Sequence, residues 1–301
     1  MDFLTDEKRQ LALTDVQIAK MLPKRKRNSH KGTYGRAAIV AGSEEYTGAA
    51  YLSAAASLRS GAGYTALFVP SEILPYYILK APEILLKTSN EGSRYALNEK
   101  TMEQVCEYDA VAYGMGMGVS EAVAEGAAYL LSRFQGRLIL DADGLNSLSV
   151  YKKEGLSALF KNAKCDVVLT PHIQEFSRLS GLSVEEILNT DLKVATAFAK
   201  ANSVTLLLKN AATIITDGQR SAVNITGNSG QAKAGSGDVL SGVIAGLCAQ
   251  GASGFDGACA GAFLCGRAAE IAVKSVGEYS LTASDCLQKL GEAFLSVLDL
   301  A

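Results

Sequence analysis

The stretch Asn228-Ser-Gly-Gln-Ala-Lys-Ala-Gly-Ser-Gly-Asp-Val-Leu-Ser-Gly-Val-Ile-Ala-Gly-Leu247 decides the fold. Glycines allow the loop at Gly235, Ser236 and Gly237 to curl so that several backbone N–H groups face one point. The apolar helix that follows adds its unpaired N–H groups and the positive end of its dipole. This pattern predicts a pocket for an anion such as phosphate, with Asp238 kept ionised as a base. A glycine turn capped by an aspartate is the alternative.

Outward from this loop, the chain alternates apolar strands with helices. Strands separated by helices indicate an α/β fold with a mostly parallel central sheet and helices on both faces. Two short segments around Asp217-Gly218 predict a hairpin. The predicted strands cover residues 37–41, 65–69, 109–113, 137–140, 167–170, 205–209, 213–216 and 222–225, and the predicted helices cover 48–63, 121–134, 191–201, 239–249, 255–273 and 283–298.

Polar and glycine-rich motifs follow five of the predicted strands. In parallel sheets the carboxyl ends of the strands share one edge, and ligands bind there. We therefore expect an enzyme site at that edge. The five motifs are Gly42-Ser43 and residues 114–118, 141–146, 170–175 and 209–213.

Two of these motifs allow more than one interpretation. The spacing of Gly114-x-Gly-x-Gly118 differs from the dinucleotide fingerprint and predicts a glycine turn lining a ligand rather than a phosphate-binding turn. His172 directly follows a buried strand, with Glu175 three residues on. A ligand contact and a satisfied polar residue are equally consistent with that position.

Composition limits the class of protein. The chain has 301 residues, 48% of them hydrophobic and 20% charged, with a formal net charge of −2. These values predict a globular protein without a nucleic-acid partner, and no apolar run is long enough to span a membrane. Six scattered cysteines without a Cys-x-x-Cys pair favour a reducing cytoplasm. Residues 1–30 are expected to form an N-terminal arm, and residues 31–301 one domain.

Motifs in a fixed order resemble the ADP/ATP-dependent NAD(P)H-hydrate dehydratases of the ribokinase-like superfamily. They span residues 24–298, nearly the whole chain. The matching pieces are residues 31–36, 46–50, 59–63, 141–146, 169–172 with Glu175, and 228–242.

The resemblance implies a lyase that repairs metabolites, a hydro-lyase acting on the S-form of hydrated NADH or NADPH. ADP or ATP would phosphorylate the ring hydroxyl, and elimination of phosphate would then restore the dihydropyridine ring. Asp238 would take the hydroxyl proton while the amides of Gly235, Ser236 and Gly237 stabilise the phosphoryl group. Mg²⁺ would bridge the nucleotide phosphates, since the chain offers no metal site of its own.

The resemblance also assigns the remaining binding residues. Ala49, Gly116, His172 and Asp238 match positions that meet the hydrate. Gly237 matches one that meets the adenine nucleotide, as do Lys209, Asn210, Ala211, Ala212 and Thr213. Asn210 and Gln174 stand where the family usually has glycine, and a left-handed backbone at Asn210 would preserve the turn. Gln231 and Lys233 are also less usual choices.

Other functions remain open. A ribokinase-fold kinase for a hydroxymethylpyrimidine or a sugar is the main alternative, but residues 40–48 are too short for the lid that sugar kinases add after the first strand. A non-catalytic nucleotide-binding protein has no need of the Asp238 carboxylate, and a nicotinamide oxidoreductase would need the missing fingerprint. The resemblance implies a separate NAD(P)H-hydrate epimerase as functional partner and a homo-oligomer.

Overall fold

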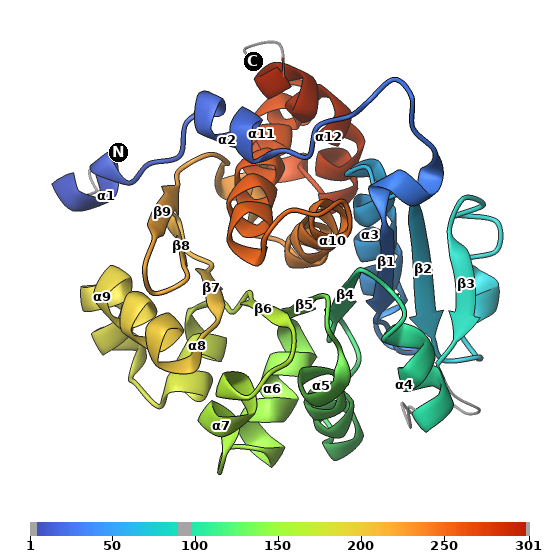
Figure 1. Cartoon of the computed structure of the whole chain (residues 1–301). Coiled ribbons are helices and arrows are strands. Elements are labelled where there is room, and N and C mark those ends of the chain that lie inside the picture. The colour runs from blue at the N-terminus through green and yellow to red at the C-terminus, as the bar shows by residue number, and fades with distance from the viewer. Residues whose placement is uncertain (1–4, 90–97, 299–301) are drawn as a thin grey trace.

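A computed structural model describes residues 5–89 and 98–298 of the chain. In this part of the chain nine strands form one sheet in the order β3-β2-β1-β4-β5-β6-β7-β8-β9 (Figure 1). The first seven strands in that order are parallel, while β8 and β9 form the predicted antiparallel hairpin. The strands are β1 Arg36–Val40, β2 Tyr64–Val69, β3 Leu85–Thr88, β4 Ala110–Tyr113, β5 Arg137–Leu140, β6 Asp166–Leu169, β7 Thr205–Leu208, β8 Thr213–Thr216 and β9 Ser221–Asn224.

Helices cover both faces of the sheet, as predicted. One face carries α3 Thr47–Arg59, α10 Ser236–Ala249, α11 Gly254–Ser280 and α12 Ala283–Leu298, and the other carries α4 Glu99–Val105, α5 Glu121–Arg133, α6 Ala142–Tyr151, α7 Leu156–Lys161, α8 Ile173–Ser180 and α9 Val184–Asn202 (Figure 1). Alternation along β1 divides its side chains between the two layers. Ala37 and Ile39 pack in the core of the first layer, and Ala38 and Val40 in the core of the second.

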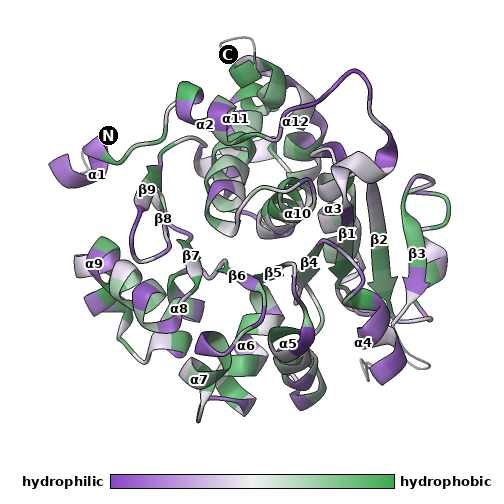
Figure 2. Cartoon of the chain, viewed as in Figure 1, coloured by the Kyte–Doolittle hydropathy of each residue, from purple (hydrophilic) through white to green (hydrophobic). Residues whose placement is uncertain are grey.

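Small residues allow α10 to lie directly on α3. A methyl group at Gly242 would lie 2.1 Å from the Ser53 carbonyl oxygen, and one at Gly246 would lie 2.4 Å from that of Ser57. Hydrophobic residues colour most of α10 in Figure 2, and every residue from Val239 to Ala249 is buried. The helix that begins at the glycine loop is therefore fixed in the core from Val239 onward.

The N-terminal arm packs on the body of the protein. Its described part contains α1 Asp6–Gln10 and α2 Asp15–Met21, while residues 1–4 lie outside the described range. Between the two helices, Leu13 N–H donates to the Val223 carbonyl oxygen at 2.9 Å, and Ile18 of α2 is fully buried. The boundary at residues 30 and 31 stays a prediction.

Two general features follow from the whole set of described residues. No helix within residues 5–89 or 98–298 is both long and apolar enough to cross a bilayer. All six cysteines lie in this part of the chain and are free thiols.

The structure also contains elements that the sequence analysis did not predict. Among them are α1, β3, α4, α6, α7 and α8. β3 is a short edge strand with only one neighbour, and α6 and α8 begin inside motifs that were interpreted only as loops after strands. The loop after β1 spans only residues 41–46 and holds no strand, so no lid is inserted there.

Candidate active site

The five predicted motifs meet at the carboxyl edge of the parallel strands. Gly42 N–H donates to the Met115 carbonyl oxygen at 2.8 Å, which joins the loops after β1 and β4. Gly118 N–H donates to Asp143 Oδ2 at 2.8 Å, which joins the loops after β4 and β5. Lys209 N–H, after β7, donates to the Pro171 carbonyl oxygen after β6 at 2.9 Å. The motifs therefore form one continuous surface, as the parallel sheet predicts.

The glycine loop presents unpaired amides at the start of α10. Gly235 is the N-cap residue, has a left-handed backbone with φ of +95°, and supplies no side chain to cap the helix. Within the described residues, the N–H groups of Gly237 and Asp238 have no acceptor, and that of Ser236 makes only a 3.4 Å contact with the Lys233 carbonyl oxygen. Free N–H groups at the positive end of a 14-residue helix form a site for an anion.

A buried ion pair lies beside these amides. Lys209 Nζ is 2.9 Å from Asp141 Oδ1, and Ser241 Oγ donates to Asp141 Oδ2 at 2.7 Å. The Asp141 side chain is only 2% exposed. A methyl group at Gly237 would lie 3.4 Å from Lys209 Nζ. The ammonium group is therefore held at the edge of the anion site, where it can contact a phosphate that the amides bind.

Burial at the site changes the proton affinity of Asp238. Removal from water, with the nearby charge of Asp141, raises the pKa of Asp238 to about 6, although Lys209 opposes the shift. The sequence predicted a carboxyl that is kept ionised as a base; its pKa is raised because desolvation is the largest effect, but it stays below neutral pH. Burial alone would lower the pKa of Lys209, but the charges of Asp141 and Glu175 outweigh it and raise that pKa. At neutral pH Asp238 is an ionised base beside a cation.

Ala49 and Gly116, predicted to meet the hydrate, lie against one another. A methyl group at Gly116 would lie 2.9 Å from Ala49 Cβ and 2.7 Å from Tyr46 Cβ. Gly116 has a left-handed backbone with φ of +63°. Tyr46 is 54% exposed at the start of α3. Two small residues and an aromatic ring make a surface that a planar ring can approach closely.

His172 caps α8 through one ring nitrogen, and its other ring nitrogen, Nε2, lies 3.5 Å from Glu175 Oε1. Its Nδ1 accepts from the N–H groups of Gln174 at 3.1 Å and Glu175 at 3.2 Å, and Glu175 Oε2 accepts from His172 N–H at 2.8 Å. Burial and the Lys209 charge lower the pKa of His172, so the ring is neutral. The hydrogen bonds assign the remaining proton to Nε2 on a side chain that is 47% exposed. The capping interpretation is thus confirmed, and a ligand contact through Nε2 stays a prediction.

Residues 209–213, predicted to meet the nucleotide, form the tight turn between β7 and β8. Asn210 does not adopt the predicted left-handed backbone, because the positive-φ residues other than glycine are Ala142 and Ser203. Instead its Oδ1 accepts from Ala211 N–H at 2.9 Å, and Thr213 Oγ1 donates to its carbonyl oxygen at 3.1 Å. The side chain therefore closes the turn that glycine would make by backbone freedom. Ala212, next along, is buried.

Sequence reasoning missed the central role of Asp141. Its carboxylate joins the loop after β5 to β7 and α10, through residues 68 and 100 positions away in the chain. The motif Asp141 to Asn146 was recognised without a role for its first residue. The three-residue spacing between Asp238 and Ser241 was the signal available, since it puts both side chains on one side of α10.

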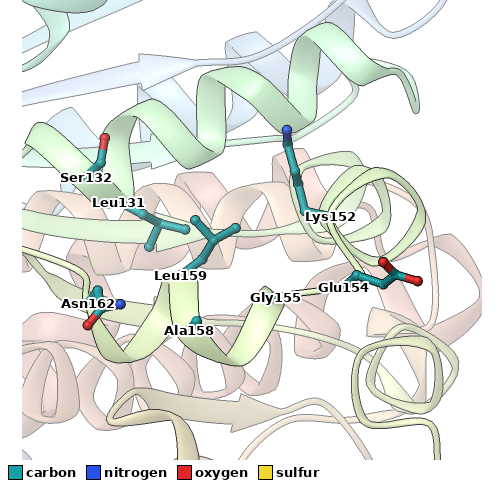
Figure 3. A pocket seen from close by; sticks show the side chains of 8 residues that line it. All are labelled: Leu131, Ser132, Lys152, Glu154, Gly155, Ala158, Leu159 and Asn162. Atoms are coloured by element: carbon teal, nitrogen blue, oxygen red, sulfur yellow. The ribbon is translucent and has the colours of Figure 1, made fainter.

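Other features of the surface are separate from the site. A cavity of about 340 Å³ lies beside α5 and α7 and shares no residue with the site. Figure 3 shows the side chains that line it. Its lining residues are Leu131, Ser132, Lys152, Glu154, Gly155, Ala158, Leu159 and Asn162. In residues 5–89 and 98–298 no group of three or more His, Cys, Asp or Glu side chains is arranged to hold a metal ion.

Comparison with known proteins gives the family. A sequence model described as NAD(P)H-hydrate dehydratase matches residues 37–291. The bifunctional NAD(P)H-hydrate repair enzyme Nnr of Moorella thermoacetica is 37% identical over 284 residues, which cover 92% of this chain and 52% of that protein. The ADP-dependent (S)-NAD(P)H-hydrate dehydratase of Neisseria meningitidis is 33% identical over 276 residues, which cover 90% of this chain and 88% of that protein.

Comparison with solved structures agrees with the family that the sequence comparisons indicate. The ADP/ATP-dependent NAD(P)H-hydrate dehydratase of Bacillus subtilis, co-crystallised with ATP/Mg²⁺, superposes with a TM-score of 0.81 at 26% identity, covering 95% of this chain and 98% of that chain. The expected ribokinase-like fold is confirmed by such neighbours. The chain spans about half the length of the first curated relatives that it matches. With a family match over residues 37–291 and the glycine loop, Asp238 and the His172 loop at one sheet edge, the chain belongs to the NAD(P)H-hydrate dehydratase family.

Proposed function

We propose that this chain dehydrates the S-form of hydrated NADH or NADPH and uses ADP or ATP as phosphoryl donor. Two relatives support this proposal: the Neisseria protein is an ADP-dependent (S)-NAD(P)H-hydrate dehydratase, and the Bacillus protein is an ADP/ATP-dependent NAD(P)H-hydrate dehydratase. The observation that carries it is the position of Asp238, a half-buried base on the helix turn whose amides are unpaired and next to the Lys209 ammonium.

The first chemical step is phosphoryl transfer to the ring hydroxyl. Asp238 accepts the hydroxyl proton while the hydroxyl oxygen forms a bond to the terminal phosphorus, and the bond from that phosphorus to the rest of the nucleotide breaks. The amides of Gly237 and Asp238 and the ammonium of Lys209 stabilise the charge on the phosphoryl oxygens. Each group is already held in place, by α10 or by Asp141, so little reorganisation is needed during the reaction.

The second step removes phosphate. The lone pair of the ring nitrogen assists departure of the phosphate from carbon, and loss of a proton from the neighbouring carbon restores the double bond. Hydroxide is a poor leaving group and phosphate a good one, so the nucleotide makes this elimination feasible. Ala49, Gly116 and Tyr46 provide a close surface for the planar ring, and His172 Nε2–H is available to donate to the carboxamide or ribose.

The residues at this site fit an Mg²⁺ ion that binds together with the nucleotide. The oxygen donors near the loop are carboxylates, which Mg²⁺ prefers, but Asp141 is already paired with Lys209 and Ser241. Asp143, whose Oδ2 already accepts from Gly118 N–H, is the further carboxylate whose charge acts on Asp238, and it would help to hold a cation that accompanies the nucleotide, leaving Asp238 as the base. When bound, Mg²⁺ neutralises charge on those phosphates.

The test is to mix the protein with hydrated NADH and ADP or ATP and to follow the absorbance of regenerated NADH. We expect NADH and inorganic phosphate in equal amounts, and no turnover of sugars or pyrimidine alcohols. The variant Asp238→Asn should bind nucleotide and lose about 10²- to 10⁴-fold in turnover, the usual contribution of a positioned base. A stable phosphorylated organic product would overturn the proposal in favour of a kinase.

We further propose three properties expected from the sequence. The protein acts in the cytoplasm, which the six free thiols support. It works with an NAD(P)H-hydrate epimerase, which would supply the S-form, and it forms a homo-oligomer. Cell fractionation, activity on a mixture of both hydrate stereoisomers with and without an epimerase, and light scattering test these properties in turn.

A further inference from the structure

We propose that Glu270 of α11 is a positioning residue that anchors Gly227, the first residue of the loop 227–235 that leads into α10, and so helps to fix the nucleotide-binding amides at the start of α10. The inference rests on the proposed nucleotide site, but Glu270 itself lies outside that site. Its link to the loop is direct, because Glu270 Oε1 accepts a hydrogen bond from Gly227 N–H at 3.0 Å. Gly227 lies eight residues before Gly235, between the end of β9 and the start of α10.

Gly227 is a constrained point in the backbone. Its φ of +113° is a conformation that residues with a side chain rarely adopt, and a methyl group there would lie 2.3 Å from Gln231 Oε1. Gln231 Oε1 accepts from Asn228 N–H at 3.3 Å, and Gln231 Nε2 donates to the Cys265 carbonyl oxygen of α11 at 3.4 Å. The side chain that seemed unusual in the sequence thus joins the loop to the same helix.

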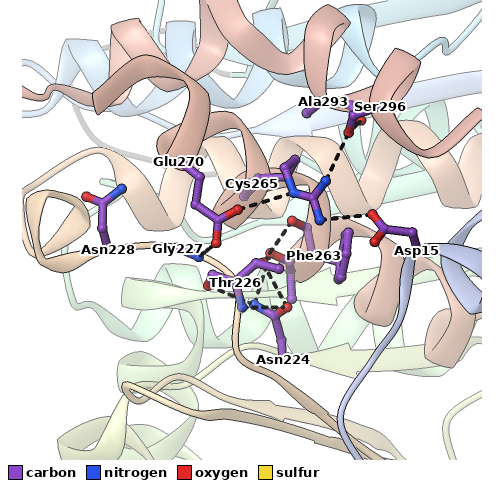
Figure 4. A network of polar contacts seen from close by, with 12 residues as sticks. Asp15, Asn224, Thr226, Gly227, Asn228, Phe263, Cys265, Glu270, Ala293 and Ser296 are labelled. Atoms are coloured by element: carbon purple, nitrogen blue, oxygen red, sulfur yellow. Dashed lines mark hydrogen bonds and ion pairs between the residues drawn. The ribbon is translucent and has the colours of Figure 1, made fainter. Parts of the chain in front are cut away.

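Glu270 is itself held by an arginine. Glu270 Oε2 lies 3.2 Å from Arg267 Nε, as an ion pair rather than a well-aligned hydrogen bond. Arg267 Nη2 donates to Asp15 Oδ1 at 2.9 Å, and its guanidinium lies over the Phe263 ring at 5.1 Å. Figure 4 shows the sequence of contacts that runs from Asp15 in the arm to Glu270 and Gly227. The arm, α11 and the loop are therefore connected through charged groups.

The far end of the loop is fastened to α11 in the same way. Lys233 Nζ donates to the carbonyl oxygens of Tyr279 at 2.5 Å and Leu281 at 2.8 Å. Ser229 Oγ donates to the Glu278 carboxylate. Cations bind well at carbonyls near a helix C-terminus. The loop thus rests on side-chain contacts at Gly227, Ser229 and Lys233, and Glu270 fixes the end where the chain leaves the sheet.

The amides of the anion site must stay in place without a strand to hold them. Preorganised donors bind charge well because they do not need to be ordered at the moment of binding. The buried part of α10 begins at Val239, so the positions of Gly237 and Asp238 also depend on the loop that leads into them. Freeing Gly227 allows this loop, and the amides that follow it, to move away from the phosphate. We therefore expect loss of Glu270 to weaken nucleotide binding, although no atom of Glu270 contacts the nucleotide.

Two conservative variants separate positioning from simple charge pairing. Glu270→Gln keeps an oxygen at the right distance for Gly227 N–H but loses the charge that attracts Arg267. Glu270→Asp keeps the charge but is one methylene shorter, so it cannot reach Gly227 N–H in the same backbone. If Glu270 acts by positioning Gly227, Glu270→Asp should weaken nucleotide binding and Glu270→Gln should not. If Glu270 acts only through its ion pair with Arg267, Glu270→Gln should weaken nucleotide binding more than Glu270→Asp.

The experiment measures Mg²⁺–ADP affinity of the full chain by calorimetry, and KM and kcat for turnover, well below the unfolding temperature of each variant. Glu270→Asp and Glu270→Ala should bind Mg²⁺–ADP about tenfold more weakly, the usual worth of one charge-assisted hydrogen bond, with the Glu270→Gln value within about threefold of the parent. The matched control is Glu292→Ala, which breaks a similar pair with Lys289 on α12 (2.6 Å) and should leave affinity unchanged.

The inference is overturned if Glu270→Asp binds like the parent, or if Glu270→Gln is as weak as Glu270→Asp. A parent chain that binds Mg²⁺–ADP but does not turn over hydrated NADH would contradict the proposed function and leave this inference standing. The two failures are therefore distinguishable, because the affinity measurement needs no hydrate.

Discussion

Replacing the proposed base should make the protein more stable. Asp238→Asn removes a carboxyl whose pKa is about 6 in the folded protein instead of its ordinary 3.8, chiefly because the carboxyl is buried. Between these two values the folded chain binds more protons at this position than the unfolded chain. The free energy of unfolding of the parent therefore falls as pH rises through this window, and the loss is complete above about pH 6.

The size of the effect follows from the two pKa values. The difference between 3.8 and about 6 corresponds to about 3 kcal/mol as an upper bound at neutral pH. Asp238 is only partly enclosed in the absence of a ligand, so solvent screening reduces the measurable gain to roughly 1–2 kcal/mol. Asparagine has nearly the same shape and carries no charge, so packing around α10 is preserved.

Urea unfolding of the parent and Asp238→Asn without nucleotide, at about pH 4.5 and about pH 7.5, measures the effect. We expect Asp238→Asn to be more stable at the higher pH, with a smaller gap at the lower pH. Asp285→Asn is a control of opposite sign, because hydrogen bonds from Thr282 lower the pKa of Asp285 and its loss should destabilise at neutral pH. Identical pH dependence for the parent and Asp238→Asn would show that Asp238 is not desolvated.

Three further substitutions test the site. Gly237→Val places a side chain whose Cβ lies 3.4 Å from Lys209 Nζ, so calorimetry should show weaker Mg²⁺–ADP binding with an unchanged melting temperature. An unaltered affinity would mean that the loop is only a helix cap. Lys209→Met leaves the Asp141 carboxylate buried without its cation, so urea unfolding should show a free energy of unfolding about 3 kcal/mol lower, and adding Asp141→Asn should largely restore it. If the two substitutions lower the free energy of unfolding additively, the proposed coupling is wrong. His172→Ala should raise the KM for the hydrate about tenfold and lower stability by about 1 kcal/mol, whereas His172→Asn should restore the cap alone; recovery of both would limit His172 to capping.

Local patterns were sufficient to predict most of the sheet. The run Ala37 to Ala41 is apolar at every position, which is what a strand buried on both faces requires, and Val40 and its neighbours are indeed fully buried. β3 was not predicted because it lies at the edge of the sheet, where among the described strands it pairs with β2 alone. Its residues Leu85 and Lys87 are exposed, so no clear burial pattern marks it in the sequence.

The site was predictable only where its residues are close in the chain. Asp238 and its amides belong to one loop and helix start, so their local pattern was recognisable. The pair of Asp141 with Lys209 joins residues 68 positions apart, and only the folded sheet brings them to 2.9 Å. The raised pKa of Asp238 could not be predicted for the same reason: its helix was visible in the sequence, but the burial and the Asp141 charge that raise the pKa depend on the tertiary structure.

A destabilised carboxylate is useful at this position. Asp238 is a stronger base with a pKa of about 6 than it would be at 3.8, and it is still mostly ionised at neutral pH. The two neighbouring charges act in opposite directions, since Asp141 raises this pKa and Lys209 lowers it. Lys209 is also the cation that faces the anion site. A bound phosphate would therefore partly neutralise the Lys209 charge, so the ionised form of Asp238 would be less stabilised. Phosphoryl donor binding should therefore increase the basicity of Asp238 when a hydroxyl proton must be removed.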